Sequence, residues 1–445
     1  KINKDGQLTV NNGLFNRAGS AGLLIRADSN GMGSLIHHFD GVEGTVECYF
    51  EEDQWHGVTP SVSGASADVF EGIYLKYYTE VDSSWTYITN PNQSMEAARG
   101  YFACKYDDPA LISWEGTLNN GDLTLNLSYT STASHLGQGW NMIGNLYPSS
   151  VDFDGNWISS NLDGTIYLYD GAQYVNWNPS TGAGSHGSGY IPPGQAFWVH
   201  AFNDNPSIEI PQNKRTHSSQ AFYKSEQENG LTLDVAGNGY MDQVNIVFLE
   251  DATMDFDPPY DGYKLFGVEK APQIYIAQNG INYSLNCVPQ SPDLTITLML
   301  ETGAPGLYTL TDKSESFLIY DDVYLEDLLT GDMIHLTQSG SYSFQSGPDD
   351  DKARFLLHFY GVSGTDAAPE WQNFNIYSAN NTIYVASEKE VSGKIEVFDL
   401  LGKKVFSDHL ALQGEKRIGI EVPSGFYIVT FSDTDNALTK KIFIK

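Results

Sequence analysis

Short runs of alternating apolar and polar residues, each ended by Gly, Asn, Asp or Pro, recur throughout this chain. Examples are LTLDVAG (231–237), PQIYIAQNG (272–280) and GFYIVTF (425–431). Alternation with a period of two puts one set of side chains on a buried face and the other in water, as in a β-strand. No run keeps the period of an amphipathic helix. The chain is therefore predicted to be all-β, with 43 Gly and 18 Pro supplying the turns.

The length of 445 residues is too great for one ordinary hydrophobic core. Two polar, turn-rich stretches, 212–230 and 360–371, mark candidate boundaries. We predict three units in tandem, residues 1–215, 216–365 and 366–445. The middle unit, with about nine strand candidates, is expected to be a β-sandwich. The last has seven strand candidates and is expected to be a small immunoglobulin-like sandwich.

The first unit is expected to be a β-sandwich, a jelly-roll-like fold or the end of a β-solenoid, and it repeats one plan. WHGVTPSV at Trp55 is answered by WNMIGNLYPSSV at Trp140, and IYLKYY at Ile73 by IYLYDG at Ile166. RGYFACKYDDP is likewise answered by GQAFWVHAFNDNP. Internal duplication of a strand set is one explanation, and chance similarity among aromatic-rich strands is the other.

Composition excludes several classes of protein. The net charge of −32 argues against nucleic-acid binding, which needs Lys and Arg to neutralise phosphates. The sequence has no signal peptide and no apolar run of membrane length, and its abrupt start suggests a mature or truncated form. Cys48, Cys104 and Cys287 are too far apart in sequence for a metal knuckle. We expect buried free thiols, with a Cys48–Cys104 bridge as the alternative.

Three ordered motifs close the chain: KIEVFDLLGKKVF (394–406), VPSGFYIVTF (422–431) and LTKKIFIK (438–445). The first is predicted to be a β-hairpin with Gly402 at its turn. Together they resemble the type A C-terminal sorting domain of the type IX secretion system of Bacteroidota. That resemblance implies a seven-stranded immunoglobulin-like sandwich, an outer-membrane translocon as partner, and a secreted or cell-surface location. The sorting positions that it implies are Asp399, Gly402, Lys403, Val405, Gly425, Tyr427, Lys440 and Lys441.

A second resemblance lies upstream. GWNMIGNLYPSSVD, with IYLYDGAQYVNW and YIPPGQAFWVHA after it, is similar to a module that often precedes such sorting domains in surface proteins of these bacteria. The sequence departs from that module at Leu146, where the module has Pro. These modules accompany many kinds of cargo, so the resemblance implies an architecture and a destination but no activity.

Calcium is the metal to consider in an acidic β-protein. DFDGNWISSNLD places Asp152, Asp154, Asn156 and Asp163 at positions 1, 3, 5 and 12 of an EF-hand-like loop. The glycine stands at position 4 rather than 6, and position 12 is Asp rather than a bidentate Glu. We therefore favour an Asx-rich surface turn over a Ca²⁺ site and predict no cofactor.

The sequence offers no catalytic motif, so no catalytic residue is assigned and no enzymatic activity is expected. Seven of the eight tryptophans fall in the first unit, most of them in or beside strand candidates, where core packing is favoured. Trp157 and Trp177 adjoin Gly- and Asn-rich stretches and are the candidates for ligand binding.

The sequence thus predicts a non-catalytic, secreted or surface-displayed protein, adhesive, structural or binding a glycan or a host or matrix protein. The alternative is the accessory C-terminal part of a secreted glycosidase or peptidase whose catalytic domain lies upstream of Lys1.

Overall fold

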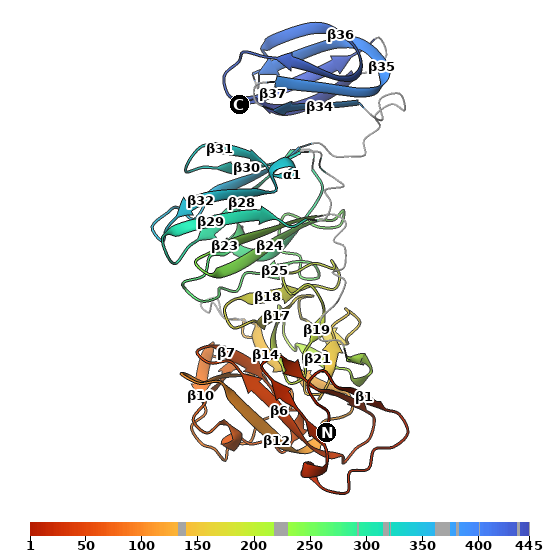
Figure 1. Cartoon of the computed structure of the whole chain (residues 1–445), viewed down its shortest axis with the longest axis vertical. Helices are drawn as coiled ribbons and strands as arrows, with labels where there is room; N and C mark the ends of the chain where they lie inside the picture. The colour runs from red at the N-terminus through yellow and green to blue at the C-terminus, as the bar shows by residue number, and fades with distance from the viewer. Residues whose placement is uncertain are drawn as a thin grey trace.

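The computed structural model of the chain describes residues 1–131, 139–217, 230–291, 293–314, 320, 322–360, 374–379, 382–399, 401–433 and 437–444. These residues form β-strands almost throughout, which confirms the all-β prediction. The short helical elements are η1 (Ser20–Gly22), η2 (Ala67–Phe70), η3 (Gln212–Lys214) and α1 (Leu336–Ser339). No helix in the described part of the chain is long and apolar enough to span a membrane. Four hydrophobic cores follow one another, and Figure 1 shows their units in a row.

The predicted unit 1–215 contains two of these cores, so the observed units are numbered from the N-terminus, one for each of the four cores. The first unit is a β-sandwich, with two four-stranded sheets that share one core. Inward side chains of both sheets, such as Trp114, Leu75 and Tyr101, meet in that core, as in a sandwich. One sheet has the order β2-β6-β12-β8, with β2 (Leu24–Ile25), β6 (Glu43–Phe50), β12 (Ala110–Leu118) and β8 (Val62–Ser63). The other has the order β10-β9-β11-β7, with β10 (Ser84–Tyr87), β9 (Tyr74–Thr79), β11 (Tyr101–Cys104) and β7 (Trp55–Val58). Two small pairs flank them, β1 (Gln7–Val10) with β5 (Ser34–His37) and β3 (Ala27–Asp28) with β4 (Gly31–Met32).

The second unit repeats this arrangement around its own core. One sheet has the order β18-β17-β20-β14, with β18 (Tyr174–Trp177), β17 (Ile166–Tyr169), β20 (Ala196–His200) and β14 (Trp140–Gly144). A second has the order β13-β21-β16, with β13 (Leu123–Asn126), β21 (Ser207–Ile210) and β16 (Ser159–Ser160). A third has the order β19-β15-β22, with β19 (Tyr190–Ile191), β15 (Ser150–Asp152) and β22 (Arg215–Thr216).

Strands of matching sequence occupy matching places in the two units, because β7, β9, β10 and β11 correspond in sheet order to β14, β17, β18 and β20. The two units also meet reciprocally. Val58 bridges to Gln195, and Arg99 bridges to Ile143. When β7 is superposed on β14 and β11 on β20, Val58 becomes equivalent to Ile143 and Arg99 to Gln195, so the two bridges are equivalent contacts.

The backbone hydrogen bonds beside these bridges show the same reciprocity. The N–H of Thr59 donates to the carbonyl of Gly194 at 2.8 Å, and the N–H of Gly144 donates to that of Ala98 at 2.9 Å. Each contact again maps onto the other, as in a two-fold symmetric interface. This geometry supports internal duplication, which we retain as a proposal.

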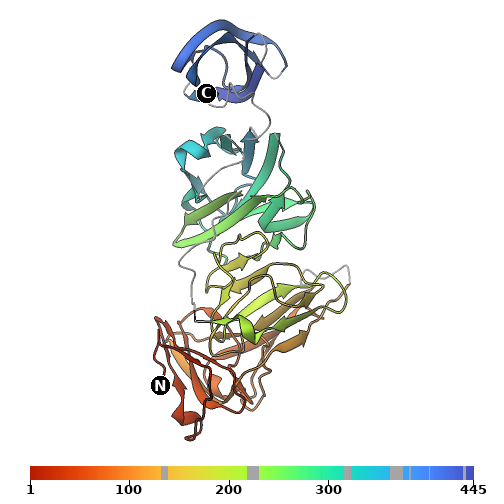
Figure 2. The same ribbon diagram turned by 90° about the vertical axis from the view of Figure 1, so that its right-hand side faces the viewer.

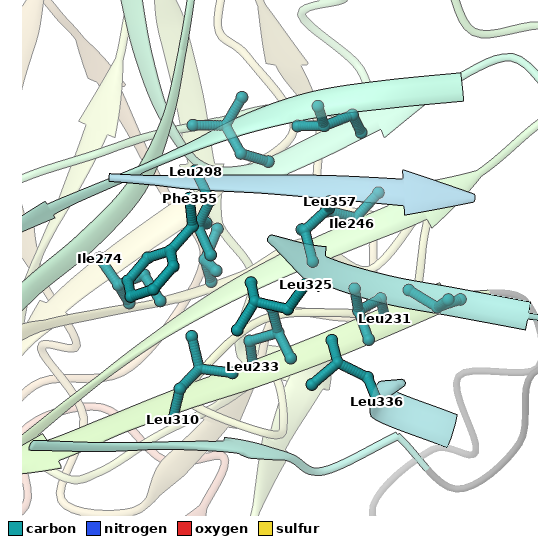
Figure 3. Close-up of a cluster of buried hydrophobic side chains, with 14 of the residues drawn as sticks. Leu231, Leu233, Ile246, Ile274, Leu298, Leu310, Leu325, Leu336, Phe355 and Leu357 are labelled. Carbon is teal, nitrogen blue, oxygen red and sulfur yellow. The ribbon is translucent and has the colours of Figure 1, made fainter. Parts of the chain in front are cut away.

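The third unit is built on one eleven-stranded sheet that folds around the largest core. Figure 3 shows how Leu231, Leu325 and Phe355, from strands far apart in sequence, point into it. The strand order is β31-β30-β33-β28-β26-β27-β24-β23-β29-β32, with β25 beside β27. The bounds are β23 (Gly230–Gly237), β24 (Tyr240–Phe248), β25 (Gly262–Tyr263), β26 (Gln273–Gln278), β27 (Ile281–Val288), β28 (Asp293–Glu301), β29 (Gly306–Asp312), β30 (Asp322–Asp327), β31 (Asp332–His335), β32 (Ser341–Ser346) and β33 (Phe355–Tyr360).

The described residues of the fourth unit form five strands, where seven were predicted. They are β34 (Phe374–Ala379), β35 (Thr382–Asp399), β36 (Lys404–Gly419), β37 (Gly425–Ser432) and β38 (Ala437–Ile444). Two long strands each cover two of the predicted ones, because the ladder between β35 and β36 shifts register between Ser387 and Val391 without ending. Figure 2 shows the unit end-on, rolled around its core.

The second and third units are joined by hydrogen bonds between buried groups. Thr165 Oγ1 donates to the carbonyl of Asp261 at 2.8 Å, and Asn178 Nδ2 donates to that of Pro259 at 3.0 Å. The N–H of Tyr263 donates to the hydroxyl of Tyr167 at 2.8 Å. These bonds tie the two units into a continuous body.

The predicted unit boundaries stay a proposal. The boundary at 215/216 falls within β22, which pairs with β15 of the second unit. The boundary at 365/366 lies outside the described residues. The third and fourth units touch through Lys440, whose Nζ lies 3.5 Å from Asp322 Oδ2, and through Phe426, whose ring lies 5.4 Å from that of Tyr360.

The three cysteines are free. Cys48 is on β6 and Cys104 is on β11, which belong to opposite sheets of the first unit, so the cross-strand bridge is not formed. Burial raises the pKa of the Cys48 thiol to about 12 and also raises that of Cys287. These thiols therefore stay protonated and unreactive at neutral pH.

Candidate functional sites

The first candidate site is the hairpin turn between β35 and β36. Asp399 Oδ1 accepts hydrogen bonds from the N–H groups of Leu401 at 3.0 Å and Lys403 at 2.8 Å. Gly402 has a φ of +80°, which a residue with a side chain adopts at a cost. Asp399 and Gly402 are thus required by the turn itself. The turn presents Leu401, which is 95% exposed, at its tip.

The remaining sorting positions lie along the strands beside that turn. Asp399 pairs with Tyr427 across β35 and β37, and Gly425 pairs with Ile444 at the end of the chain. Tyr427 is buried in the core, and its hydroxyl donates to the carbonyl of Pro423 at 2.8 Å. Val405 packs at the edge of the same core.

The two lysines of the terminal motif are on β38, away from the hairpin tip. Lys440 pairs with Val429 in the ladder, and its ammonium reaches Asp322 of the third unit. Lys441 pairs with Ile428. The structure therefore gathers the predicted sorting residues on one small unit, with Lys440 directed to its neighbour.

The second candidate site is a cavity of about 470 Å³ between the second unit and a loop of the third. The apolar part of its wall consists mostly of rings, with Trp157, Phe202 and Pro259 among them. Trp157 is 7% exposed, and its Nε1 donates to the carbonyl of Asp152 at 2.8 Å. An edge of this indole can contact a ligand, while most of its faces pack in the core.

Trp177 does not line this cavity. It is 9% exposed and belongs to the core of the second unit, where its faces are covered by protein. A side chain placed in this way has no free ring for a ligand to stack on. Of the two tryptophans, we therefore carry only Trp157 forward as a binding candidate.

The four residues proposed for calcium do not converge. Asp154 pairs with Lys214, which with Asn156 outweighs burial and lowers the pKa of the Asp154 carboxyl. Asp163 is buried and instead faces His200, whose Nδ1 lies 3.3 Å from Asp163 Oδ2. Burial raises the pKa of Asp163. Within the described ranges, no three His, Cys, Asp or Glu side chains are grouped as metal ligands.

Asn156 completes a local turn rather than a metal shell. Its N–H donates to Asp154 Oδ1 at 3.1 Å, which is the Asx-turn geometry that the sequence favoured over calcium. Burial raises the pKa of Asp152, which lies on β15. The calcium alternative therefore lacks a shared centre to which the described oxygens could point.

The sequence reasoning missed one group of aromatic side chains, on the outer face of the sheet β10-β9-β11-β7, which the second unit covers in part through Met142 and Trp198. Tyr74, Lys76 and Tyr78 point to this face, because they alternate along β9 with the core residue Leu75. Trp85 and Tyr87 join them from β10. The alternation in YLKYYT and SWTY carried this signal, but it was assigned to packing alone.

Comparison with protein families gives two matches. Residues 58–359, more than half of the chain, match the family described as "Domain of unknown function (DUF8693)". Residues 378–445 match the "Secretion system C-terminal sorting domain". The resemblance of the C-terminal unit to a type IX sorting domain is confirmed, and the protein is secreted or displayed on the cell surface.

One curated protein is similar over 424 residues at 24% identity, the minor fimbrium subunit Mfa5 of Porphyromonas gingivalis. The alignment covers 80% of this chain but only 34% of that protein, so the chain spans about a third of its relative.

Two solved structures were also matched. One is a biofilm-associated protein BSP domain, with 9% identity, coverage of 90% of this chain and 92% of that one, and a TM-score of 0.15. The other is a Ca²⁺-stabilized ice-binding adhesin of an Antarctic bacterium, with 10% identity, coverage of 90% and 93%, and a TM-score of 0.12. Scores this low carry no argument about fold or function.

The family match runs without interruption from β7 of the first unit to β33 of the third, and so includes the reciprocal contact between the first two units and the hydrogen-bonded junction with the third. With the sorting domain attached beyond it, this chain belongs to the DUF8693 family of proteins, whose function is unknown.

Proposed function

We propose that this chain is the adhesive or structural part of a surface protein of a Bacteroidota bacterium, without catalytic activity of its own. The observation that carries the proposal is a rod of joined β-sandwiches that ends in an export domain. Such a rod holds its far end away from the unit that delivers it. The fimbrial relative supports the same role, although the chain spans only about a third of it.

Rigidity is the second support. The first and second units share reciprocal backbone bonds, and the second and third share bonds between buried groups, such as that from Thr165 to Asp261. Buried polar groups that are paired across a junction are costly to separate, because each would be left without a partner. The three sandwiches therefore behave as one arm, as a stalk or a binding subunit requires.

We further propose that the sorting residues act through the shape of the last unit. Asp399 and Gly402 form the hairpin turn, while Gly425 and Tyr427 place β37 beside it. In this proposal the type IX translocon recognises the folded unit with its exposed tip, and glycan or matrix-protein ligands bind elsewhere on the arm. The cavity beside Trp157 is one candidate place for such a ligand.

Attachment assays test the adhesive role. Cells that lack the gene would be complemented with the wild-type chain or with a chain truncated after Asp433, which removes β38. Binding of the cells to glass and to matrix-coated surfaces would then be counted. We expect wild-type complementation to restore attachment and the truncated chain to fail. Equal attachment of deleted, truncated and wild-type cells would refute the proposal.

A further inference from the structure

The outer face of the sheet β10-β9-β11-β7 has a lysine at its centre, surrounded by aromatic rings. The Nζ atom of Lys76 lies 3.8 Å from the ring centroid of Trp55 and 4.4 Å from that of Trp85. Phe102 and Tyr87 are the next rings, at 5.8 and 5.9 Å. Cation–π attraction of this kind holds the ammonium in place without neutralising its charge.

Lys76 has no acidic partner within the described part of the chain. The sequence contains 56 Asp and Glu residues against 24 Lys and Arg, and half of the described Lys and Arg residues in the first three units form an ion pair with one. No carboxylate forms an ion pair with Lys76, and burial lowers the pKa of its ammonium. A partly desolvated charge without a counter-ion favours an anion that can approach it.

The second unit covers part of this face, where Phe102 packs with Trp198 and its ring lies 5.6 Å from that of Tyr169. The rings at the uncovered rim are open to a ligand. Tyr74 is 55% exposed and Tyr87 is 53% exposed, and they are the exposed large apolar side chains of these four strands. Tyr106 lies edge-on to Tyr74, with ring centroids 5.4 Å apart, and widens the same rim. Each ring offers an apolar face and a hydroxyl that can hydrogen-bond.

At the uncovered rim, these four strands expose large rings but no large aliphatic side chain. This composition distinguishes the rim from a protein interface, whose buried centre combines aromatic with other apolar side chains. A flat ring face with a nearby hydroxyl suits a pyranose, which has apolar C–H faces and polar edges. The ammonium of Lys76, which forms no ion pair within the described residues, then selects for a carboxylate on that sugar.

We propose that the outer face of β10-β9-β11-β7 binds an acidic saccharide, whose carboxylate pairs with Lys76 and whose ring stacks on the exposed tyrosines. This inference rests on the proposed adhesive function and specifies a ligand class for it. Uronate and sialate sugars share the required chemistry, a pyranose that carries a carboxylate. The negative charge of the whole chain opposes anions at long range, so selectivity depends on the local ammonium.

Titration calorimetry on the purified full chain tests the proposal with two matched pairs of probes. The first pair is hexagalacturonate and its fully methyl-esterified form, and the second is sialyllactose and lactose. We expect at least one acidic probe to bind at least tenfold more tightly than its neutral partner. Neither acidic probe binding, or equal binding of acidic and neutral probes, would overturn the proposal.

Variants locate the site. Lys76→Met keeps an unbranched apolar stem between the rings but removes the charge, and should abolish the preference for the acidic probe. Lys352→Met is the matched control, because Lys352 is an exposed lysine of the third unit paired with Glu301. It should bind as the wild type does. Melting temperatures of both variants check folding, and a preference that survives Lys76→Met in a folded chain would refute the role of this lysine.

The competing occupant is another protein surface. Sedimentation of the wild-type chain and of Tyr87→Ser over a range of concentrations would reveal self-association through this face. Self-association that is lost in Tyr87→Ser, without saccharide binding, would replace the present proposal with a protein interface. Because the purified chain needs no export, a negative binding result here leaves the attachment assay, and with it the adhesive proposal, to be judged separately.

Discussion

Two turns of similar sequence, Asp-Leu-Leu-Thr-Gly at 327–331 and Asp-Leu-Leu-Gly-Lys at 399–403, provide a test of how burial changes the value of one aspartate. In both, the first aspartate accepts a hydrogen bond from the backbone N–H two residues later, at 3.0 Å. Asp327 is fully buried, whereas Asp399 is partly exposed. The same substitution should therefore have very different costs at the two positions.

Asp327 is the partner of a buried arginine. Arg354 donates from Nε to Asp327 Oδ1 at 3.1 Å and from Nη2 to Asp327 Oδ2 at 2.9 Å. Tyr342 donates its hydroxyl to the same Oδ2 at 3.0 Å. Asp327→Asn would remove the close, two-point partner of the buried guanidinium and leave it only the longer contact to Asp350 Oδ2 at 3.5 Å, which costs up to about 3–5 kcal/mol. Asp399→Asn keeps an oxygen for the turn and should cost about 1 kcal/mol or less.

Hydrogen exchange followed by mass spectrometry can report each unit by itself. In Asp327→Asn, the amides of β30 and β33 should exchange faster by a factor of up to about 10² to 10⁴, while those of the fourth unit stay as in the wild type. Asp399→Asn should change only the fourth unit, and by less than tenfold. Adding Arg354→Met to Asp327→Asn should recover part of the loss, because the unpaired charge is gone.

The pKa of Asp327 predicts how the cost of Asp327→Asn depends on pH. Burial alone would raise the pKa of Asp327, but its hydrogen bonds from Arg354 and Leu329 outweigh this and lower it below the ordinary value. A carboxylate with a lowered pKa stabilises the fold above its unfolded-state pKa of about 3.9 and loses that contribution as pH falls. The difference between wild type and Asp327→Asn should thus shrink below about pH 4. Equal costs for the two Asp→Asn variants at neutral pH would refute the reasoning.

Two further predictions concern buried groups. Burial raises the pKa of Asp261 to about 7, so the folded chain holds a proton that the unfolded chain releases near pH 4. Stability of the third unit should fall by up to about 4 kcal/mol as pH rises from about 4 to about 7, and Asp261→Asn should flatten this dependence in melts at several pH values. A wild-type curve already flat over that range would contradict it. Trp157→Ala should destabilise the second unit by about 3–5 kcal/mol, and Trp157→Phe by less, in urea titrations followed by exchange. A loss below about 1 kcal/mol for Trp157→Ala would show that this side chain is not part of the core.

The strands could be predicted from sequence because the direction of a side chain along a strand is a local property. Alternation therefore located most strands of the third unit. In the fourth unit, Gly402 correctly marked the turn between β35 and β36. One strand there, β27, was overlooked although Tyr283, Leu285 and Cys287 alternate in it. In the fourth unit, alternation could not show that the chain continues through Ser387 to Val391 as one bent strand.

Partners distant in sequence could not be predicted. The motif match aligned Arg99 with Gly194, but the strand ladders make it equivalent to Gln195, because register is set by pairing between strands. Trp157 and Pro259, both in the wall of the cavity, are about a hundred residues apart. Lys76 and Trp55 likewise meet only because β9 and β7 flank β11. Such sites depend on sheet order, which a single sequence does not display.

Delivery to the cell surface by the last unit is the central claim, and surface fractionation of the native host tests it most directly. The chain truncated after Asp433 lacks β38, whose Ile442 and Ile444 are buried in the core of that unit. Leu298→Ala is the control, because it weakens the core of the third unit by about 2–5 kcal/mol and leaves the C-terminus intact. We predict that the truncated chain is absent from the surface and retained inside the cell, while the control arrives. Normal surface amounts of the truncated chain would contradict the account.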